Sequence, residues 1–101
     1  MKFGGMNMQA MMAQARKMQE QIAKAQEELE AAELTGTAGS GLVSVTLSGK
    51  KKMLKVALKP AIVDPDDIEM LEDLILVAYN DALGQVQALE AKIMPNTGGL
   101  M

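Results

Sequence analysis

The stretch GLVSVTLSGKKKMLKVALK, residues 41–59, decides the fold of this chain of 101 residues. Apolar and polar residues alternate on both sides of Gly49-Lys50-Lys51. The alternating apolar residues are Val43, Val45, Leu47, Leu54, Val56 and Leu58. A period of two places them on one face of a strand, and a Gly-containing break between two such runs is typical of a hairpin. The stretch therefore predicts a β-hairpin with one apolar face, which is unstable in water until another element covers it.

A long helix is predicted before the hairpin, over residues 7–34, which contain no Gly, Pro or aromatic residue. Its apolar residues step alternately by three and four positions, the spacing of a heptad seam. They are Met8, Met11, Ala15, Met18, Ile22, Ala25, Leu29 and Ala32. Such a helix is about 40 Å long at about 1.5 Å per residue, longer than the compact core of a chain this size. We therefore expect part of the seam to pack against a second copy of the chain.

The segment TGTAGSG, residues 35–41, is turn-like because Gly recurs in it. Leu34-Thr35-Gly36 is therefore predicted to end the first helix. A short strand at 35–37 is the alternative, and it would extend the hairpin into a three-stranded meander.

A second helix is predicted to begin at Asp64-Pro65-Asp66-Asp67. Asp64 is expected to cap it, Pro65 suits the first turn, and acidic residues there complement the helix dipole. The apolar stripe that follows consists of Ile68, Leu71, Ile75, Ala78, Ala82, Val86, Leu89 and Ile93. This stripe predicts that the helix covers the apolar face of the hairpin.

The first half of the second helix carries three further apolar residues, Leu74, Leu76 and Val77, and is expected to be the more buried half. Pro95 is predicted to end the helix. Residues 1–94 would then form a single domain, and residues 95–101 a flexible C-terminal tail.

The residues that the chain lacks exclude several classes of chemistry. It has no Cys and no His, which removes disulfides, thiolates, the commonest general base and the commonest metal ligand. No segment reaches the roughly 18 uninterrupted apolar residues of a membrane span, and the N-terminus lacks the apolar region of a signal peptide. We therefore expect a soluble, cytoplasmic protein with no cofactor, no membrane partner and no small-molecule substrate.

Charge is segregated along the chain, although the net charge is only −3. Residues 35–63 carry five Lys and no acid, whereas residues 64–101 carry eight acids and one Lys. In residues 1–34 the four basic residues precede nearly all of the five acids. Such segregation favours a polar partner.

Three patterns that resemble ligand sites have simpler structural explanations. Gly36, Gly39 and Gly41 lie between a helix and a strand, the reverse order of a P-loop, and suit a loop with positive φ. The six acids of residues 64–73 suit a capped, solvated helix start, and they lack the spacing of an EF-hand. The Met run at 6–18 suits packing better than soft-metal binding. We therefore predict no metal site.

The basic residues fall into two groups. They are Lys50, Lys51, Lys52, Lys55 and Lys59 in the hairpin, and Lys2, Arg16, Lys17 and Lys24 in the first helix. Solvated faces and protection of a sheet edge explain such lysines, and phosphate binding is the alternative. No aromatic residues interleave with them, and no recognition-helix or zinc-finger motif is present. Any DNA binding should therefore be directed at the backbone, with low sequence specificity.

Four linked segments carry a resemblance to a known family. They are KMQEQIAKAQEEL at 17–29, LTGTAGSGLVSVTLSG at 34–49, VALKPAIVDPDDIEMLEDLILVAYNDAL at 56–83, and a Gly-rich C-terminal tail. Together they resemble the YbaB/EbfC family of bacterial nucleoid-associated DNA-binding proteins. The resemblance covers residues 5–100, and TGTAGSGLV after the first helix is its most specific feature.

The resemblance implies an α+β fold in the order α-β-β-β-α: a long helix, a three-stranded antiparallel sheet and a second long helix. It implies an intertwined homodimer whose helical arms project like tweezers. It also implies binding of double-stranded DNA by basic residues of these arms, association with the nucleoid, and an influence on gene expression. The matching positions in this sequence are Lys2, Arg16, Lys17, Lys24 and Lys92.

We therefore expect a dimeric, nucleoid-associated protein that binds duplex DNA and is not an enzyme, since no nucleophile–base pair is visible. Because the second helix is acidic, the basic first half of the N-terminal helix should face the duplex. The alternative is a dimeric adaptor that binds a protein partner through its Met-rich arm. Salt separates the two, because rising salt weakens DNA binding steeply and leaves apolar docking largely unchanged.

Overall fold

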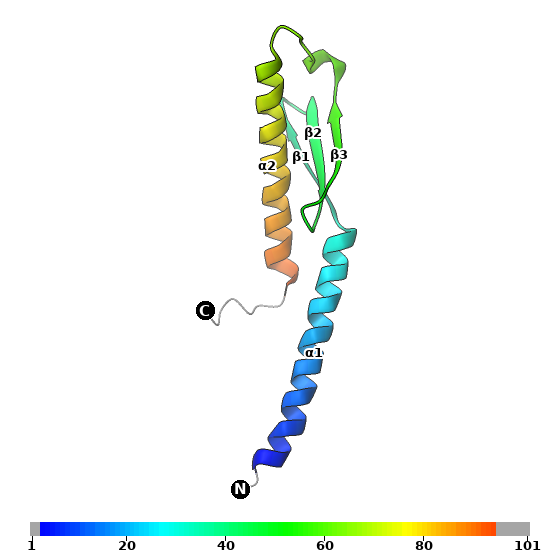
Figure 1. The fold of residues 1–101 in the computed structure, drawn as a ribbon, viewed down its shortest axis with the longest axis vertical. Helices are drawn as coiled ribbons and strands as arrows, with labels where there is room; N and C mark the ends of the chain where they lie inside the picture. The colour runs from blue at the N-terminus through cyan, green and yellow to red at the C-terminus, as the bar shows by residue number, and fades with distance from the viewer. Residues whose placement is uncertain (1–2, 95–101) are drawn as a thin grey trace.

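The structure, a computed structural model, describes the backbone of residues 3–94 and the side chains of residues 8–94. Its elements are α1 (Phe3–Ala31), β1 (Glu33–Ala38), β2 (Val43–Ser48), β3 (Met53–Leu58), the 3-10 helix η1 (Pro60–Ile62) and α2 (Ile68–Ile93). The strands form one antiparallel sheet in the order β1-β2-β3 (Figure 1). The predicted α-β-β-β-α fold is thereby confirmed. The predicted tail at 95–101 lies outside the described residues.

The β2–β3 hairpin is the one that the alternating sequence predicts. Val43 pairs with Leu58 and Val45 with Val56, so these four side chains share one face of the sheet. The two valines of β2 are fully buried on that face. The alternation therefore identified the core strand of the molecule, which is β2.

The first helix ends three residues earlier than the sequence predicts, at Ala31. Leu34, expected to end that helix, lies in β1 opposite Leu47. Glu33 and Leu34 favour helix by local propensity, but pairing with β2 satisfies their backbone groups and half-buries the Leu34 side chain. The alternative of a strand at 35–37 is the correct one, and the strand extends over all of β1.

The helix α2 lies directly on the sheet at Gly36 (Figure 1). A Cβ built on Gly36 would overlap the backbone of Ala78 and Ala82 on α2. Both alanines, and Val86 one turn further on, are fully buried. Small residues on both sides thus allow the helix backbone to approach the strand closely. Gly is needed at position 36 because no side chain fits there, and not because the backbone has a positive φ.

The N-terminus of α2 also differs from the prediction. The N-cap is Asp67, whose side chain accepts a hydrogen bond from the backbone N–H of Met70 at 3.2 Å. Asp64 instead closes the preceding turn, because its Oδ1 accepts from the Asp66 N–H at 2.9 Å. Asp64, which the sequence predicts as the N-cap, therefore forms an Asx turn instead.

The half of α2 that was expected to be the more buried carries two of its most exposed apolar side chains, Leu76 at 59% and Val77 at 55%. The expectation is wrong because α2 packs mainly over β1 and β2, through its small central residues. On β3 the sheet face remains open, and Val56 and Leu58 are 44% and 38% exposed. One flank of the sheet and helix layer is therefore apolar and uncovered.

The helix α1 leaves this layer and extends away from it, so that the molecule measures 78 × 25 × 16 Å (Figure 1). Of its seam, only Ala25 and Leu29 are buried. We call residues 8–24 of α1 the arm. In the described part of the chain, neither long helix has an apolar run sufficient to cross a membrane.

Candidate nucleic-acid interface

Three of the predicted DNA-binding residues, Arg16, Lys17 and Lys24, lie on the arm, and all three are exposed. This stretch is helical because it consists mainly of Gln, Glu, Ala, Met, Lys and Arg, which favour helix. The arm therefore presents these cations on a rigid rod that is clear of the sheet (Figure 1).

The cations and the Met seam occupy different halves of the arm. A helix turns by about 100° per residue, so Met11 and Met18, seven residues apart, share one side. Lys17 and Lys24, also seven apart, share another side, and Arg16 lies beyond them on the same half. A polyanion can therefore contact the cations while the seam contacts something else.

One acid interrupts the basic half of the arm. Glu20 lies four residues after Arg16 and four residues before Lys24, so it shares their face of the helix. The arm carries no other acid. The sequence contained this relationship, but only the helix places Glu20 between the two cations.

Lys92, predicted from the second helix, lies in the last turn of α2 and is exposed. A shallow hollow connects this turn with the arm, and it is lined by Gln21, Lys24, Ala25, Glu28 and Ile93. The structure thus brings Lys92 to the same end of the molecule as Lys24. A cation at a helix C-terminus also stabilises the helix dipole, so Lys92 has a structural role as well. Lys2 lies outside the described side chains.

The hairpin tip carries three further cations, Lys50, Lys51 and Lys52. The buried Ser48 fixes its shape, because Ser48 Oγ accepts hydrogen bonds from the N–H groups of Lys50 at 3.1 Å and Lys52 at 3.2 Å. Lys51 has a positive φ of 69°, and its N–H donates to the Ser48 carbonyl at 2.9 Å. The tip is therefore a closed, ordered turn and not a loose loop.

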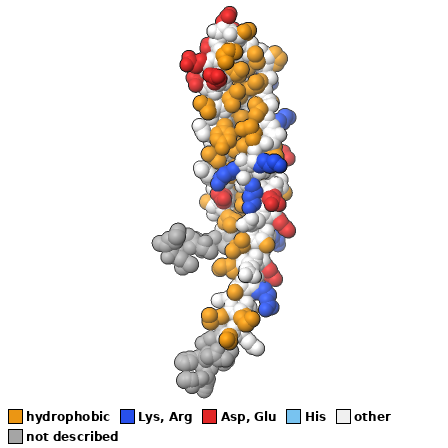
Figure 2. All heavy atoms as spheres, viewed as in Figure 1, with side chains coloured by type: hydrophobic (Ala, Val, Ile, Leu, Met, Phe, Trp, Pro, Cys, Tyr) orange, Lys and Arg blue, Asp and Glu red, His pale blue; other side chains and the backbone are white. Residues whose placement is uncertain are grey.

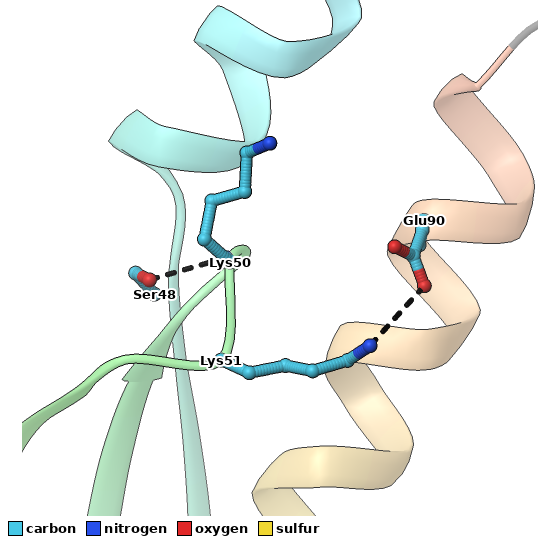
Figure 3. Close-up of polar contacts among 4 residues, drawn as sticks. All are labelled: Ser48, Lys50, Lys51 and Glu90. Atoms are coloured by element: carbon cyan, nitrogen blue, oxygen red, sulfur yellow. Dashed lines mark hydrogen bonds and ion pairs between the residues drawn. The ribbon is translucent and has the colours of Figure 1, made fainter.

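The tip is held against both helices (Figure 3). Gly49 packs on the backbone of Leu29, where a Cβ would come 2.8 Å from the Leu29 Cα. Lys50 Nζ donates to Gln26 Oε1 on α1 at 2.6 Å, and Lys51 Nζ lies 3.9 Å from Glu90 Oε1 on α2. The fold therefore brings the tip to the base of the arm, a placement that no sequence pattern indicated.

Six of the thirteen acidic residues gather at the end of the molecule where α2 begins, at the top of Figure 2. The six acids of residues 64–73 are all exposed there. Other acids lie close to the cations: Glu20 is on the arm, Glu27, Glu28 and Glu30 are in the last turns of α1, and Glu90 is beside Lys51. Among the described side chains, no group of three or more acids could hold a metal ion. The acidic start of α2 is therefore distant from the arm and the hairpin tip, whereas the acids of α1 are close to them.

The chain is similar to known bacterial proteins over nearly its whole length. The chain is 55% identical over 100 residues to a nucleoid-associated protein of Agathobacter rectalis, covering 96% of this chain and 88% of the relative. It is 47% identical over 96 residues to a nucleoid-associated protein of Chloroflexus aurantiacus, covering 94% and 96%.

A solved structure shares the fold. The crystal structure of the uncharacterized protein HP0035 from Helicobacter pylori matches with a TM-score of 0.71 at 18% identity, over 91% of each chain. The model of the YbaB/EbfC DNA-binding family matches residues 3–101. The chain therefore belongs to the YbaB/EbfC DNA-binding family of bacterial nucleoid-associated proteins.

Proposed function

We propose that this protein binds double-stranded DNA as a homodimer, through the cations of its arms, in the bacterial nucleoid, and thereby influences gene expression. The observation that carries the proposal is the arm itself, with Arg16, Lys17 and Lys24 exposed on a rod that projects beyond the core. Lys2 and Lys92 are assigned to the same interface. We propose no catalytic activity, cofactor or small-molecule substrate.

The proposed binding is directed at phosphates and has low sequence specificity. Arg and Lys spread along one side of a helix match the regular charge of a duplex, which carries one negative charge per roughly 1.7 Å of axis. Readout of bases needs side chains that enter a groove and form paired hydrogen bonds with base edges. The short, sparse row Arg16, Lys17 and Lys24 suits contacts with the backbone.

The homodimer is proposed from the uncovered apolar flank. Val56 and Leu58 of β3 lie on the helix-covered face of the sheet but beyond the reach of α2. On α2, Leu76, Tyr79 and Leu83 form one stripe, on the side turned away from Asp81 and Gln85.

The other edge of the sheet is occupied by α2. Asp81 Oδ2 accepts from the Thr37 N–H of β1 at 2.9 Å, and Gln85 Nε2 donates to the Thr35 carbonyl at 2.8 Å. The polar side of α2 therefore faces the β1 edge, which places the apolar stripe toward β3. A second copy that covers this flank would remove Val56, Leu58 and Leu76 from water, which is favourable by about 25 cal/mol per Å² of apolar surface.

A duplex-binding titration tests the proposed function. Fluorescence anisotropy of a random-sequence duplex should report tight binding at low salt that weakens steeply as salt rises. The charge reversal Arg16→Glu with Lys17→Glu should weaken binding to all sequences and flatten the salt dependence. The matched reversal Lys55→Glu with Lys59→Glu, on β3 and directly after it, should change both the affinity and the salt dependence much less. If the arm variant still forms the dimer and binds the duplex with unchanged affinity, Arg16 and Lys17 do not contact DNA.

One observation favours a second candidate function, a dimeric adaptor for a protein partner. Met8, Met11, Met12 and Met18 are between 43% and 66% exposed on the arm, and Met side chains repack around varied apolar surfaces. Docking of this kind would persist at high salt, whereas contacts with phosphates would not. The same salt series therefore separates the two functions.

A further inference from the structure

The hairpin tip, residues 49–52, forms a basic surface that the arm does not include. Its three lysines are consecutive and exposed, and the turn that carries them is closed by hydrogen bonds to Ser48. An ordered turn loses little conformational freedom when a ligand binds it. The tip is thus a small surface of fixed shape with three cations.

Two of the three charges are not neutralised by an acid. Lys50 Nζ contacts the neutral amide of Gln26, so its charge stays available. Lys52 Nζ has no hydrogen-bond or ion-pair partner among the side chains that the structure describes. Lys51 lies 3.9 Å from Glu90, at the limit of an ion pair between two half-exposed side chains. Lys50 and Lys52 are therefore the residues free to contact an anion.

The tip and two of the three arm cations, Lys17 and Lys24, face opposite sides of α1, whereas Arg16 lies about 80° from the Gln26 side. The tip touches α1 at Gln26, through Lys50. Lys24 precedes Gln26 by two residues and Lys17 precedes it by nine, which at about 100° per residue places both on the far side of the helix from Gln26. A straight duplex that lies along Lys17 and Lys24 is therefore turned away from the tip of the same chain.

We propose that the hairpin tip is a second phosphate-binding surface, through which a molecule whose arm holds one duplex segment also holds another. This inference rests on the proposed binding of DNA by the arm. Lys50 and Lys52 supply the contacts, which are directed at the backbone, and the Gln26 amide orients the Lys50 side chain. The consequence is bridging of two DNA segments, an activity that a single binding face does not give.

The lysines of β3 provide a matched control for this proposal. Lysines along a sheet edge discourage pairing with other strands without binding any ligand. Lys55 lies on β3 and Lys59 directly after it, both are exposed, and neither ammonium group has a hydrogen-bond or ion-pair partner among the described side chains. The pair Lys55→Gln with Lys59→Gln removes the same charge as Lys50→Gln with Lys52→Gln, so only the position of the charge differs.

Capture of a second duplex tests the proposal. Full-length protein is bound to a duplex on beads, and a labelled duplex in solution is then captured. The K50Q/K52Q variant should capture less by on the order of tenfold at physiological salt, while its affinity for a single free duplex stays close to that of the wild type. The K55Q/K59Q variant should behave as the wild type in both assays. The single variant K52Q removes no hydrogen bond or ion pair that the described side chains form, and it should show a smaller loss of capture in the same direction.

The outcomes separate the tip from the arm. Undiminished capture by K50Q/K52Q, or an equal loss in K55Q/K59Q, would overturn the tip as a second surface. A loss of single-duplex affinity in K50Q/K52Q as large as that of R16Q/K17Q would also overturn it, because tip and arm would then form one site. If the wild-type protein binds one duplex but captures no second, bridging is refuted and the proposed function stands. If it binds no duplex at all, the proposed function is refuted as well.

Discussion

Gly36 of β1 lies directly beneath Ala82 of α2, so that a Cβ on Gly36 would come 2.9 Å from the Ala82 Cα. This contact fixes the distance between helix and sheet. It also determines which strands α2 can cover, because the helix is centred on β1 and β2 and leaves β3 open. The open flank, on which the dimer is proposed, follows from this placement.

The first prediction concerns this contact. Gly36→Ala should lower the free energy of unfolding by about 1–3 kcal/mol, because the new methyl meets helix backbone, which cannot move as a side chain can. Thermal or urea unfolding, at one fixed protein concentration, measures the change. Gly84→Ala is the control: nothing lies within 4 Å of a Cβ there, and Ala in an exposed helix interior should stabilise by about 1 kcal/mol. A Gly36→Ala variant as stable as the wild type would contradict the close approach of α2.

The second prediction concerns the start of α2. Asp67→Ala should lower stability by about 1 kcal/mol, because the N–H of Met70 loses its capping acceptor. Asp66→Ala removes the same charge from the neighbouring residue, whose side chain makes no hydrogen bond in the described structure, and should cost much less. Equal unfolding midpoints for the two variants would show that charge near the helix dipole, and not the cap, is what matters here.

The third prediction concerns the dimer. Leu76→Glu should raise the dissociation constant of the dimer strongly, because the substitution places a charge in the apolar flank next to β3. Val77→Glu is a matched control, since Val77 is similarly exposed but lies about 100° around the helix. Sedimentation equilibrium of both variants measures the effect. A Leu76→Glu variant that dimerises as well as Val77→Glu would place the dimer interface elsewhere.

The fourth prediction concerns Glu20. Glu20→Gln should tighten duplex binding several-fold at low salt, because it removes the one acid between Arg16 and Lys24. The gain should shrink as salt rises. Glu72→Gln, at the acidic end of the molecule, changes the net charge equally and should have little effect on anisotropy titrations. A larger gain from Glu72→Gln would mean that net charge, and not the face of the arm, governs binding.

The sequence predicted the elements whose pattern is local. Alternation in β2 and β3 and the heptad spacing of α1 are properties of neighbouring residues, so the hairpin and both helices were foreseeable. The strand β1 was harder, because Glu33 and Leu34 prefer helix on their own and become strand only by pairing with β2. The N-cap is Asp67 and not the predicted Asp64, because the Asp64 side chain forms an Asx turn instead.

The candidate site also has a part that local sequence patterns predict and a part that they do not. The exposed cations of the arm could be predicted because helical spacing alone puts Arg16 and Lys17 on the half opposite the seam. The position of Lys50 beside Gln26 could not, since it depends on Gly49 packing on Leu29, a contact between residues twenty apart in the sequence. Likewise, no local pattern indicated that Leu76 would face away from the core.

The most direct test of the central claim is sedimentation velocity of the full-length protein with a short fluorescent duplex. Following the duplex signal gives the mass of the complex across a salt series. The account predicts two chains per duplex at low salt, and release of the duplex as salt rises while the two chains remain together. A complex of one chain per duplex, or a duplex that sediments unchanged at every salt concentration, would contradict it.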